Sequence, residues 1–323
     1  MIVISQKQLK SKITISRAIQ SIKEAFIASS SGKCVAPLPL VFELPKKEGE
    51  ICIKTALVEG LPTYTIKQVS VMNKNFKKGL PTLNATMNIY SRATGKLLAI
   101  LNEEGWLTNL RTACAGAIAE EIFRKKTSSV LGIIGAGTQA SWQAQVILSR
   151  TKNYKKVIIW NRTKKRAVIL RDELIKKYPK IEFSVASSVD NLVSESDTIV
   201  SVTAAKSPLI RDNMIIGGKT IIGLGSDMPN KCEVDPLLYA RANKIFVDNV
   251  KNNQLLGNIK RAIDSGNIKP KDISGEVGVL LCTKKIGRNN DTELILVSLV
   301  GIGAQDTCIG NLAYTVFSRI SKT

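Results

Sequence analysis

A glycine-rich turn follows an apolar run in SVLGIIGAGTQA, residues 129–140, and an amphipathic stretch, residues 141–150, comes directly after it. Gly135 permits a tight turn off a strand, Gly137 lets the backbone approach a pyrophosphate, and small Ala140 allows close packing of the following helix. The unpaired N–H groups and positive dipole end of such a helix attract phosphates. A second strand expected at Lys156–Trp160 completes a βαβ unit, so this pattern predicts a dinucleotide site. The residues expected to hold the dinucleotide here are Gly135, Gly137, Thr138 and Gln139.

The loop after the second expected strand reads Asn-Arg-Thr-Lys-Lys, residues 161–165. Dinucleotide folds that prefer NAD place an acid at this point to accept bonds from the ribose hydroxyls. Here Arg162 can stack on adenine or form a forked contact with a phosphate, and Thr163 can donate a hydroxyl. The loop therefore predicts NADPH in preference to NAD, held by Asn161, Arg162 and Thr163, with a merely solvated basic loop as the alternative.

Three charged residues outside this motif have surroundings that suit chemistry. Asp227 follows the run IIGLGS at the carboxyl edge of an expected strand, where ligands bind in such folds, and a turn or helix cap is its alternative role. Lys67, in TYTIKQVSV, can face a cleft or solvent. Arg111 lies among small residues in a helical pattern, so its guanidinium can face an anion or form a structural ion pair.

The composition excludes several kinds of site. The chain has no histidine, so any acid–base chemistry must use Asp, Glu, Lys, Tyr or Cys. Six cysteines are scattered without a C-x-x-C pair, which predicts no disulfide framework and no metal site. The net charge is +21, from 47 Lys and Arg residues against 26 Asp and Glu residues; the lysines are spread along the whole chain, and aromatic residues make up only 5%. This favours a surface that attracts anionic substrates over one that binds nucleic acid.

The length and the order of elements predict two lobes. At 323 residues and 44% hydrophobic content, the chain can bury a sizeable core. The apolar run near residue 1 is too short for a signal peptide, and no apolar stretch reaches membrane-spanning length, so we expect a cytoplasmic protein without a membrane partner. The first lobe is expected to contain a helix and a meander of strands. From residue 129 to about 250, strands alternate with helices, as in a doubly wound parallel sheet. The expected elements of the first lobe are a helix at 16–29 and strands at 40–44, 50–55, 63–72, 86–90 and 97–102.

A helical pattern at residues 108–125 joins the two lobes, and the apolar segment 293–320 is expected to form one long buried helix that packs back on the first lobe. The predicted fold class is α/β, with a Rossmann doubly wound domain at 113–292. An α+β domain, residues 1–112 with 293–323, is completed by the C-terminal helix. Because a small meandering sheet with apolar residues on both faces needs cover, we expect a homodimer formed through the first lobe.

Taken together, the motifs resemble those of the ornithine cyclodeaminase and mu-crystallin family, which includes cyclic ketimine reductases and archaeal-type alanine dehydrogenases. The similarity spans nearly the whole chain, and residues 286–306 resemble the family's closing segment. The other segments that carry it are KKGLPTLNA at 77–85, ATGKLLAIL at 93–101, LTNLRTACAGAIA at 107–119, IIGAGTQASWQ at 133–143, SVTAAKSPLI at 201–210 and GSDMPNKCEVD at 225–235.

The resemblance implies that Lys67 and Arg111 hold the substrate carboxylate, with Lys67 also polarising the reacting centre, and that Asp227 exchanges a proton with the substrate nitrogen. It also implies a dimer built through the N-terminal lobe. The matching segments place Thr82 in the substrate site and Thr203 in the cofactor site. The chain departs from the family where an arginine usually follows the first proline-containing turn: only Pro39 or Leu40 stands near that point, and Lys54 is a candidate substitute.

These features predict an NADPH-dependent reductase of a cyclic ketimine, such as pyrroline- or piperideine-2-carboxylate. Hydride would pass to the C=N carbon while Asp227 protonates the nitrogen, giving an L-amino acid. The alternatives are an ornithine or lysine cyclodeaminase that releases ammonia with tightly bound NAD, an alanine dehydrogenase-like enzyme, and a non-catalytic NADPH-binding protein. The presence of Lys67, Arg111 and Asp227 together favours an enzyme, whereas the missing arginine favours a binding protein.

Overall fold

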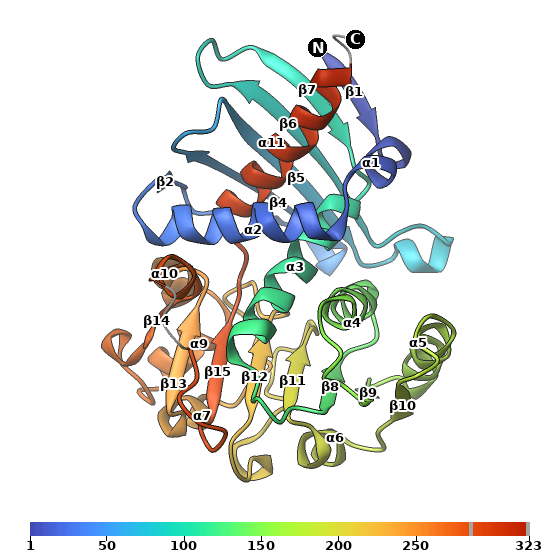
Figure 1. Ribbon diagram of the computed structural model, residues 1–323, viewed down its shortest axis with the longest axis vertical. Helices are drawn as coiled ribbons and strands as arrows, with labels where there is room; N and C mark the ends of the chain where they lie inside the picture. Colours follow the sequence, from blue (N-terminus) through green and yellow to red (C-terminus); the bar gives the residue numbers. More distant parts are fainter. Residues whose placement is uncertain (284–286, 321–323) are drawn as a thin grey trace. The chain divides into compact units, whose positions relative to one another are not determined.

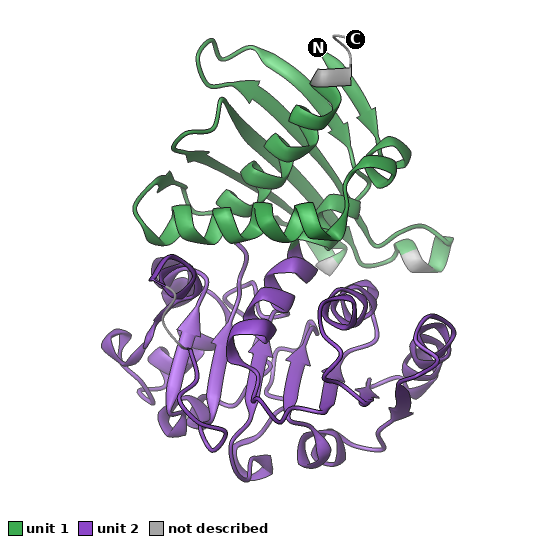
Figure 2. Cartoon of the chain, in the orientation of Figure 1, with its two compact units in different colours: residues 1–111, 302–323 green, residues 112–301 purple. Residues whose placement is uncertain are grey.

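A computed structural model describes residues 1–283 and 287–320. Ile286, in the closing segment noted above, and residues 321–323 of the expected first domain lie outside the described residues. The chain divides into two compact units, coloured separately in Figure 2: Met1–Arg111 with Ile302–Thr323, and Thr112–Gly301. No helix in the described part of the chain is long and apolar enough to cross a lipid bilayer.

The first unit is a sheet covered by helices (Figure 1). Its sheet has the order β1-β7-β6-β5-β4-β2, with β3 paired to β4; β4 to β7 are antiparallel, and β1 runs parallel to β7. Its strands are β1 (Ile2–Ser5), β2 (Cys34–Val35), β3 (Leu40–Glu43), β4 (Gly49–Val58), β5 (Thr63–Met72), β6 (Leu83–Ser91) and β7 (Leu97–Asn102). Its helices are α1 (Gln6–Lys12), α2 (Ile15–Ser30) and α11 (Gly303–Ile320).

The two faces of this sheet differ in burial because side chains alternate along each strand. In β4, Ala56 and Val58 are buried against α11 while Leu57 between them is exposed. In β5, the same alternation buries Thr63, Thr65 and Lys67. Helix α11 thus covers one face of the sheet, as the sequence predicts for a C-terminal helix.

The segment expected to form one helix at 293–320 is instead a strand followed by a helix. Residues Ile295–Ser298 form β15 in the sheet of the second unit, and α11 begins only at Gly303. An apolar run does not distinguish a buried strand from a buried helix; here two neighbouring parallel strands, β12 and β13, supply the hydrogen-bond partners of β15. The boundary between the units therefore falls after Gly301 and not at residue 293.

The second unit is a parallel sheet with the order β10-β9-β8-β11-β12-β15-β13-β14, which is the doubly wound arrangement expected from the sequence. Its strands are β8 (Val130–Ile134), β9 (Lys156–Trp160), β10 (Glu182–Val185), β11 (Thr198–Ser201), β12 (Thr220–Gly223), β13 (Lys244–Val247), β14 (Gly275–Glu276) and β15. Its helices are α4 (Thr138–Arg150), α5 (Lys164–Lys177), α6 (Val189–Glu195), α7 (Pro236–Arg241), α8 (Val250–Leu255), α9 (Gly257–Asp264) and α10 (Val277–Thr283). Helix α3 (Trp106–Phe123) carries the chain from the first unit into the second.

The chain changes direction across this sheet between β8 and β11. From β8 it proceeds to β9 and β10 on one side, then returns to β11 on the other side of β8. The carboxyl ends of parallel strands at such a switch point leave a crevice in which ligands bind. The sheet thus positions a ligand site at the ends of β8, β9 and β11.

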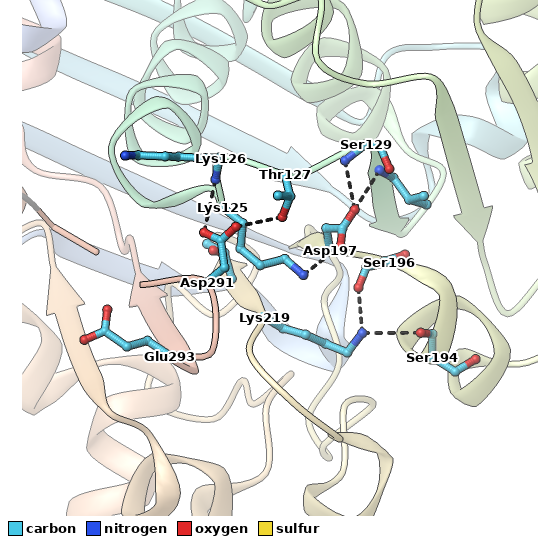
Figure 3. Close-up of polar contacts among 12 residues, drawn as sticks. Lys125, Lys126, Thr127, Ser129, Ser194, Ser196, Asp197, Lys219, Asp291 and Glu293 are labelled. Carbon is cyan, nitrogen blue, oxygen red and sulfur yellow. Dashed lines mark hydrogen bonds and ion pairs between the residues drawn. The ribbon is translucent and has the colours of Figure 1, made fainter. Parts of the chain in front are cut away.

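The opposite, amino edge of this sheet is fixed by polar contacts (Figure 3). Asp197 accepts hydrogen bonds from the backbone N–H groups of Ser129 and Val130, at 2.8 and 3.0 Å, and forms an ion pair with Lys125 at 2.8 Å. Lys219 donates to the carbonyl of Ser196 at 2.7 Å. These bonds occupy donors and acceptors at the ends of strands and helices, so this edge is structural.

Candidate functional site

A pocket lies at the carboxyl ends of β8, β9 and β11, where the topology predicts a ligand. The glycine turn forms one wall, the loop after β9 forms a second, and the loop after β11 forms a third. Its lining residues are Gly135, Ala136, Gly137, Trp160, Asn161, Arg162, Val202, Thr203, Ala204, Ala205 and Leu209.

The geometry of the glycine turn fits a dinucleotide. Gly135 has a φ of +116°, which side-chain-bearing residues rarely adopt, and its N–H donates to the Trp160 carbonyl at 2.8 Å. Gly137 caps helix α4 without a side-chain hydrogen bond, and a Cβ there would point into open space. Bare backbone and the first N–H groups of α4 are therefore available to a pyrophosphate.

The loop after β9 presents one cation, Arg162, to this pocket. Arg162 is exposed and lines the pocket, while the Asn161 side-chain amide donates to the Thr163 carbonyl at 3.0 Å and holds the loop's shape. Helix α5 starts directly after Thr163 with no acidic residue in its first turn. A helix N-terminus with cations and no acid is arranged to receive an anion.

The remaining expected cofactor residues have different surroundings. Thr203 lines the pocket, but its N–H and hydroxyl both donate to Glu233, at 2.6 and 2.9 Å. Thr138 is exposed at the start of α4, and Gln139 is half-buried beside it; neither lines the pocket. Thr203 is therefore part of the pocket wall, but both of its hydrogen-bond donors are already bonded to Glu233.

The first unit brings Lys67 and Arg111 together around one acid. Lys67 Nζ lies 2.7 Å from Oδ1 of Asp306, and Arg111 Nε lies 3.2 Å from the same oxygen. The side chains of Lys67 and Asp306 are completely buried, and that of Arg111 is 9% exposed. Lys54 is opposite Lys67 in the register of β4 and β5 and is also buried.

The electrostatics of this cluster are dominated by burial and by the excess of cations. Burial, together with the charges of Arg111 and Lys54, outweighs the attraction of Asp306 and lowers the pKa of Lys67 to about 8. Burial opposes ionisation of Asp306, but the charges of Lys67, Arg111 and Lys54 prevail and hold its pKa below the usual value. With a pKa of about 8, the Lys67 ammonium group loses its proton at a much lower pH than an ordinary lysine does.

Two further residues complete the cluster. Gln305 accepts a hydrogen bond from Arg111 Nη1 at 3.1 Å through its side-chain oxygen. Within the described residues, Gln305 Nε2 and Asp306 Oδ2 are buried without a hydrogen-bond partner. Glu103, whose pKa burial raises, accepts bonds from the N–H and hydroxyl of Thr108 and so caps the start of α3, the helix that carries Arg111.

Sequence reasoning missed Gln305, Asp306 and Glu103. Asp306 could have been suspected because it is an acid within the apolar run GIGAQDTCIG. A carboxylate buried in such a run requires a polar or charged partner. The identity of that partner was not readable, because Lys67 lies 239 residues away in the chain.

Thr82 is not joined to this cluster. It is exposed in the loop before β6, where its carbonyl accepts from the Met72 N–H at 2.8 Å. The next residue, Leu83, pairs with Val71, which is four residues from Lys67 and so roughly 13 Å away along β5.

Asp227 belongs to the second unit, in the loop that follows β12. Its side chain is 44% exposed and forms an ion pair with Lys231 at 2.7 Å, a partner that the sequence did not reveal. Asp227 caps no helix of the described residues. It is therefore an accessible acid held beside an ammonium group.

A sequence profile of the ornithine cyclodeaminase/mu-crystallin family matches residues 1–322. The iminosuccinate reductase of Paracoccus denitrificans is 31% identical, with 96% of this chain and 94% of that protein aligned. The structure of Thermococcus litoralis Δ1-pyrroline-2-carboxylate reductase with NADH and L-proline matches with a TM-score of 0.92 and 28% identity, covering 99% and 98% of the two chains. An archaeal alanine dehydrogenase dimer with bound NAD matches with a TM-score of 0.89 and 28% identity, covering 99% and 96%.

The doubly wound sheet with its glycine cradle and the second sheet unit define an NAD(P)-dependent oxidoreductase of the class that acts on C–N bonds. The chain belongs to the ornithine cyclodeaminase/mu-crystallin family. The family and fold class expected from the sequence are thereby confirmed.

Proposed function

We propose that this protein is an NADPH-dependent reductase that converts a cyclic imine carboxylate, such as pyrroline- or piperideine-2-carboxylate, to an L-amino acid. The observation that carries the proposal is the buried cluster of the first unit. Lys54, Lys67 and Arg111 are three cations against the carboxylates of Asp306 and Glu103. Such an excess of buried positive charge is stabilised by an incoming anion, and an α-carboxylate supplies one.

Each proposed residue has a defined task. Arg111 and Lys67 bind the carboxylate, and the ammonium group of Lys67 draws electron density from the adjacent C=N bond. When bound, the nicotinamide cofactor supplies the hydride that the imine carbon accepts. The Asp227 side chain, which is 44% exposed, takes up a proton from solvent and passes it to the imine nitrogen, so the C=N bond becomes a C–N single bond with one hydrogen added at each atom. The resulting Asp227 carboxylate has Lys231 as its counterion.

The preference for NADPH is proposed from the loop at residues 161–165 and the start of α5. Arg162 lines the pocket, and no carboxylate is present in this loop to accept bonds from a free ribose 2′-hydroxyl. A 2′-phosphate would gain charge-assisted contacts with Arg162. The alternative is a preference for NAD, because the related structures contain NADH or NAD. Binding measurements must therefore compare the two cofactors.

We propose a homodimer that forms through the open face of the first sheet. Register and alternation place Val35, Leu40, Phe42 and Leu57 on the same face, and their exposed fractions are 70, 55, 48 and 42%. Helix α11 covers the other face. An apolar sheet face of this kind suits a self-complementary contact with a second copy.

The test is a substrate panel with two readouts, nicotinamide absorbance and ammonia release. We expect oxidation of NADPH with a cyclic imine carboxylate and no ammonia release from ornithine or lysine. Asp227→Asn should leave NADPH binding intact and lower turnover by about 10²- to 10⁴-fold, because an amide cannot exchange the proton. Asp190→Asn, at an exposed acid on α6, is the matched control.

The other outcomes identify the alternatives. Ammonia release from a diamino acid without net use of cofactor would indicate a cyclodeaminase, and turnover of pyruvate with ammonia would indicate an alanine dehydrogenase. Tight NADPH binding without turnover of any of these compounds would favour a non-catalytic binding protein. An unchanged rate in Asp227→Asn would contradict the assignment of the acid.

A further inference from the structure

Glu233 is a completely buried carboxylate between two loops at the carboxyl edge of the second unit's sheet. Its Oε1 accepts hydrogen bonds from the Ser201 hydroxyl at 2.7 Å and from the N–H and hydroxyl of Thr203 at 2.6 and 2.9 Å. Its Oε2 accepts from the Gly225 N–H at 2.8 Å. The backbone N–H of Glu233 donates to the side-chain oxygen of Asn258 at 2.8 Å, which fixes the position of the residue.

The two oxygens serve loops with different tasks. Oε1 holds Thr203, which belongs to the wall of the dinucleotide pocket after β11. Oε2 holds Gly225, which is two residues before the proposed proton donor, Asp227, in the loop after β12. One side chain thus connects the pocket wall to the loop that carries the acid.

The two loops are also packed directly against one another. A Cβ on Gly225 would lie 2.1 Å from the Thr203 carbonyl oxygen and 2.5 Å from its nitrogen, so the backbones are in close contact at this point. This contact blocks movement of Thr203 toward Gly225, whereas movement of Thr203 away from Gly225 must either break a bond to Glu233 or draw Gly225 along through that side chain. Breaking a hydrogen bond to a buried carboxylate leaves a polar group unsatisfied inside the protein, so joint movement of the two loops is the lower-energy response.

We propose that Glu233 is a positioning residue that couples occupancy of the dinucleotide pocket to the placement of Asp227. The coupling requires only the hydrogen bonds of the second unit, whereas its catalytic meaning rests on the proposed role of Asp227. Glu233 does not contact the reacting atoms in this scheme. It transmits the position of the Thr203 wall to the Gly225–Asp227 loop.

The experiment is hydrogen exchange followed by mass spectrometry, with and without saturating NADPH, or NADH if that binds more tightly. In the unmodified protein, the cofactor should slow exchange in peptides covering residues 202–205 and also in those covering 225–231. Glu233→Gln keeps the shape but replaces one acceptor oxygen with an amide donor, so it can serve only one loop. In that variant the cofactor should still protect 202–205, while its protection of 225–231 should fall by about tenfold or more.

Ser201→Ala is the matched control, because it removes one donor to Oε1 and leaves both loops attached to Glu233; its two peptides should still respond together. If Glu233→Gln does not fold, Gly225→Ala provides a second test, since its Cβ forces the loops apart while retaining Glu233, and it should lose the joint response. Unchanged exchange at 225–231 on cofactor binding, or a joint response that survives in Glu233→Gln, would overturn the proposal.

Activity separates this inference from the proposed reaction. With a reduced imine identified, Glu233→Gln should lower kcat more than it raises the cofactor Kd, because cofactor contacts remain while the acid is misplaced. If no imine is reduced but the joint exchange response is present, the coupling stands and the proposed reaction fails.

Discussion

Asp306→Asn should lower the pKa of Lys67, and KM for a carboxylate substrate should therefore begin to rise at a lower pH. In the unmodified protein the pKa of Lys67 is about 8, so KM for a carboxylate substrate should rise up to tenfold per pH unit above that value. The substitution removes the carboxylate 2.7 Å from Lys67 Nζ and leaves the positive charges of Arg111 and Lys54 in place. A charge-assisted bond of about 1.5–3 kcal/mol corresponds to roughly one to two pH units. The rise in KM should therefore begin at least one pH unit lower.

Steady-state kinetics across pH 6 to 9, with an identified imine, measure this shift. At about pH 6 the Asp306→Asn variant should recover much of its affinity, because Lys67 regains its proton, whereas Lys67→Ala should not recover at any pH. An identical pH dependence of KM in the unmodified protein and in Asp306→Asn would refute the reasoning, as would equal behaviour of the Asn and Lys67→Ala variants at low pH.

The same shift has a consequence for folding stability. The ordinary pKa of Lys67 is 10.5, so between about pH 8 and 10.5 the unfolded chain binds this proton and the folded protein does not. Stability attributable to this group therefore rises with pH across that window. In Asp306→Asn the window should extend to lower pH, which chemical denaturation at several pH values would detect.

Three further predictions concern other parts of the molecule. Arg162→Ala should reduce the affinity for NADPH about tenfold to hundredfold and leave NADH affinity nearly unchanged, as measured by fluorescence titration; equal losses for both cofactors would contradict the contact with a 2′-phosphate. Asp197→Asn should lower the free energy of unfolding at neutral pH by about 1–3 kcal/mol, because two backbone N–H groups and Lys125 lose a charged acceptor. Burial opposes ionisation of Asp197, but these partners hold its pKa below the usual value, so the difference should disappear as acid protonates the carboxyl group; a difference that persists in acid would point to packing. The double variant Phe42→Asp, Leu57→Asp should be a monomer by light scattering. The control Ile216→Asp, at an exposed apolar residue of the second unit, should keep the molecular mass of the unmodified protein. A dimer that persists in the double variant would exclude this face as the interface.

Much of the fold was readable from the sequence because its strands carry strong local patterns. The strands expected at 63–72 and at Lys156–Trp160 have the same bounds in the structure. By contrast, Ile2–Ser5 was not recognised as a strand, because its four residues are stabilised by parallel pairing with β7, almost a hundred residues later. The strand β15 was expected to be helix for a similar reason: its parallel neighbours, and not its own residues, select the strand.

The candidate site was readable where a motif has local geometry and obscure where charges meet across the chain. The glycine cradle requires only neighbouring residues, so its position followed from the sequence. The partners of Lys67, Arg111 and Glu233 depend on tertiary packing. Local sequence therefore indicated which side chains could do chemistry but not which of them are already engaged with one another.

The discontinuous first unit has a consequence for biosynthesis. Lys67 leaves the ribosome 239 residues before Asp306, which at about 5–20 residues per second is a delay of roughly 10–50 s. The second unit, Thr112–Gly301, is contiguous and is synthesised completely before α11 emerges. Until then the sheet face that buries Thr65 and Lys67 lacks α11, and Lys67 lacks its partner Asp306. Nascent chains therefore pass through a stage in which the nucleotide domain is fully synthesised but the first sheet lacks α11, and a premature stop before residue 303 would hold them at that stage.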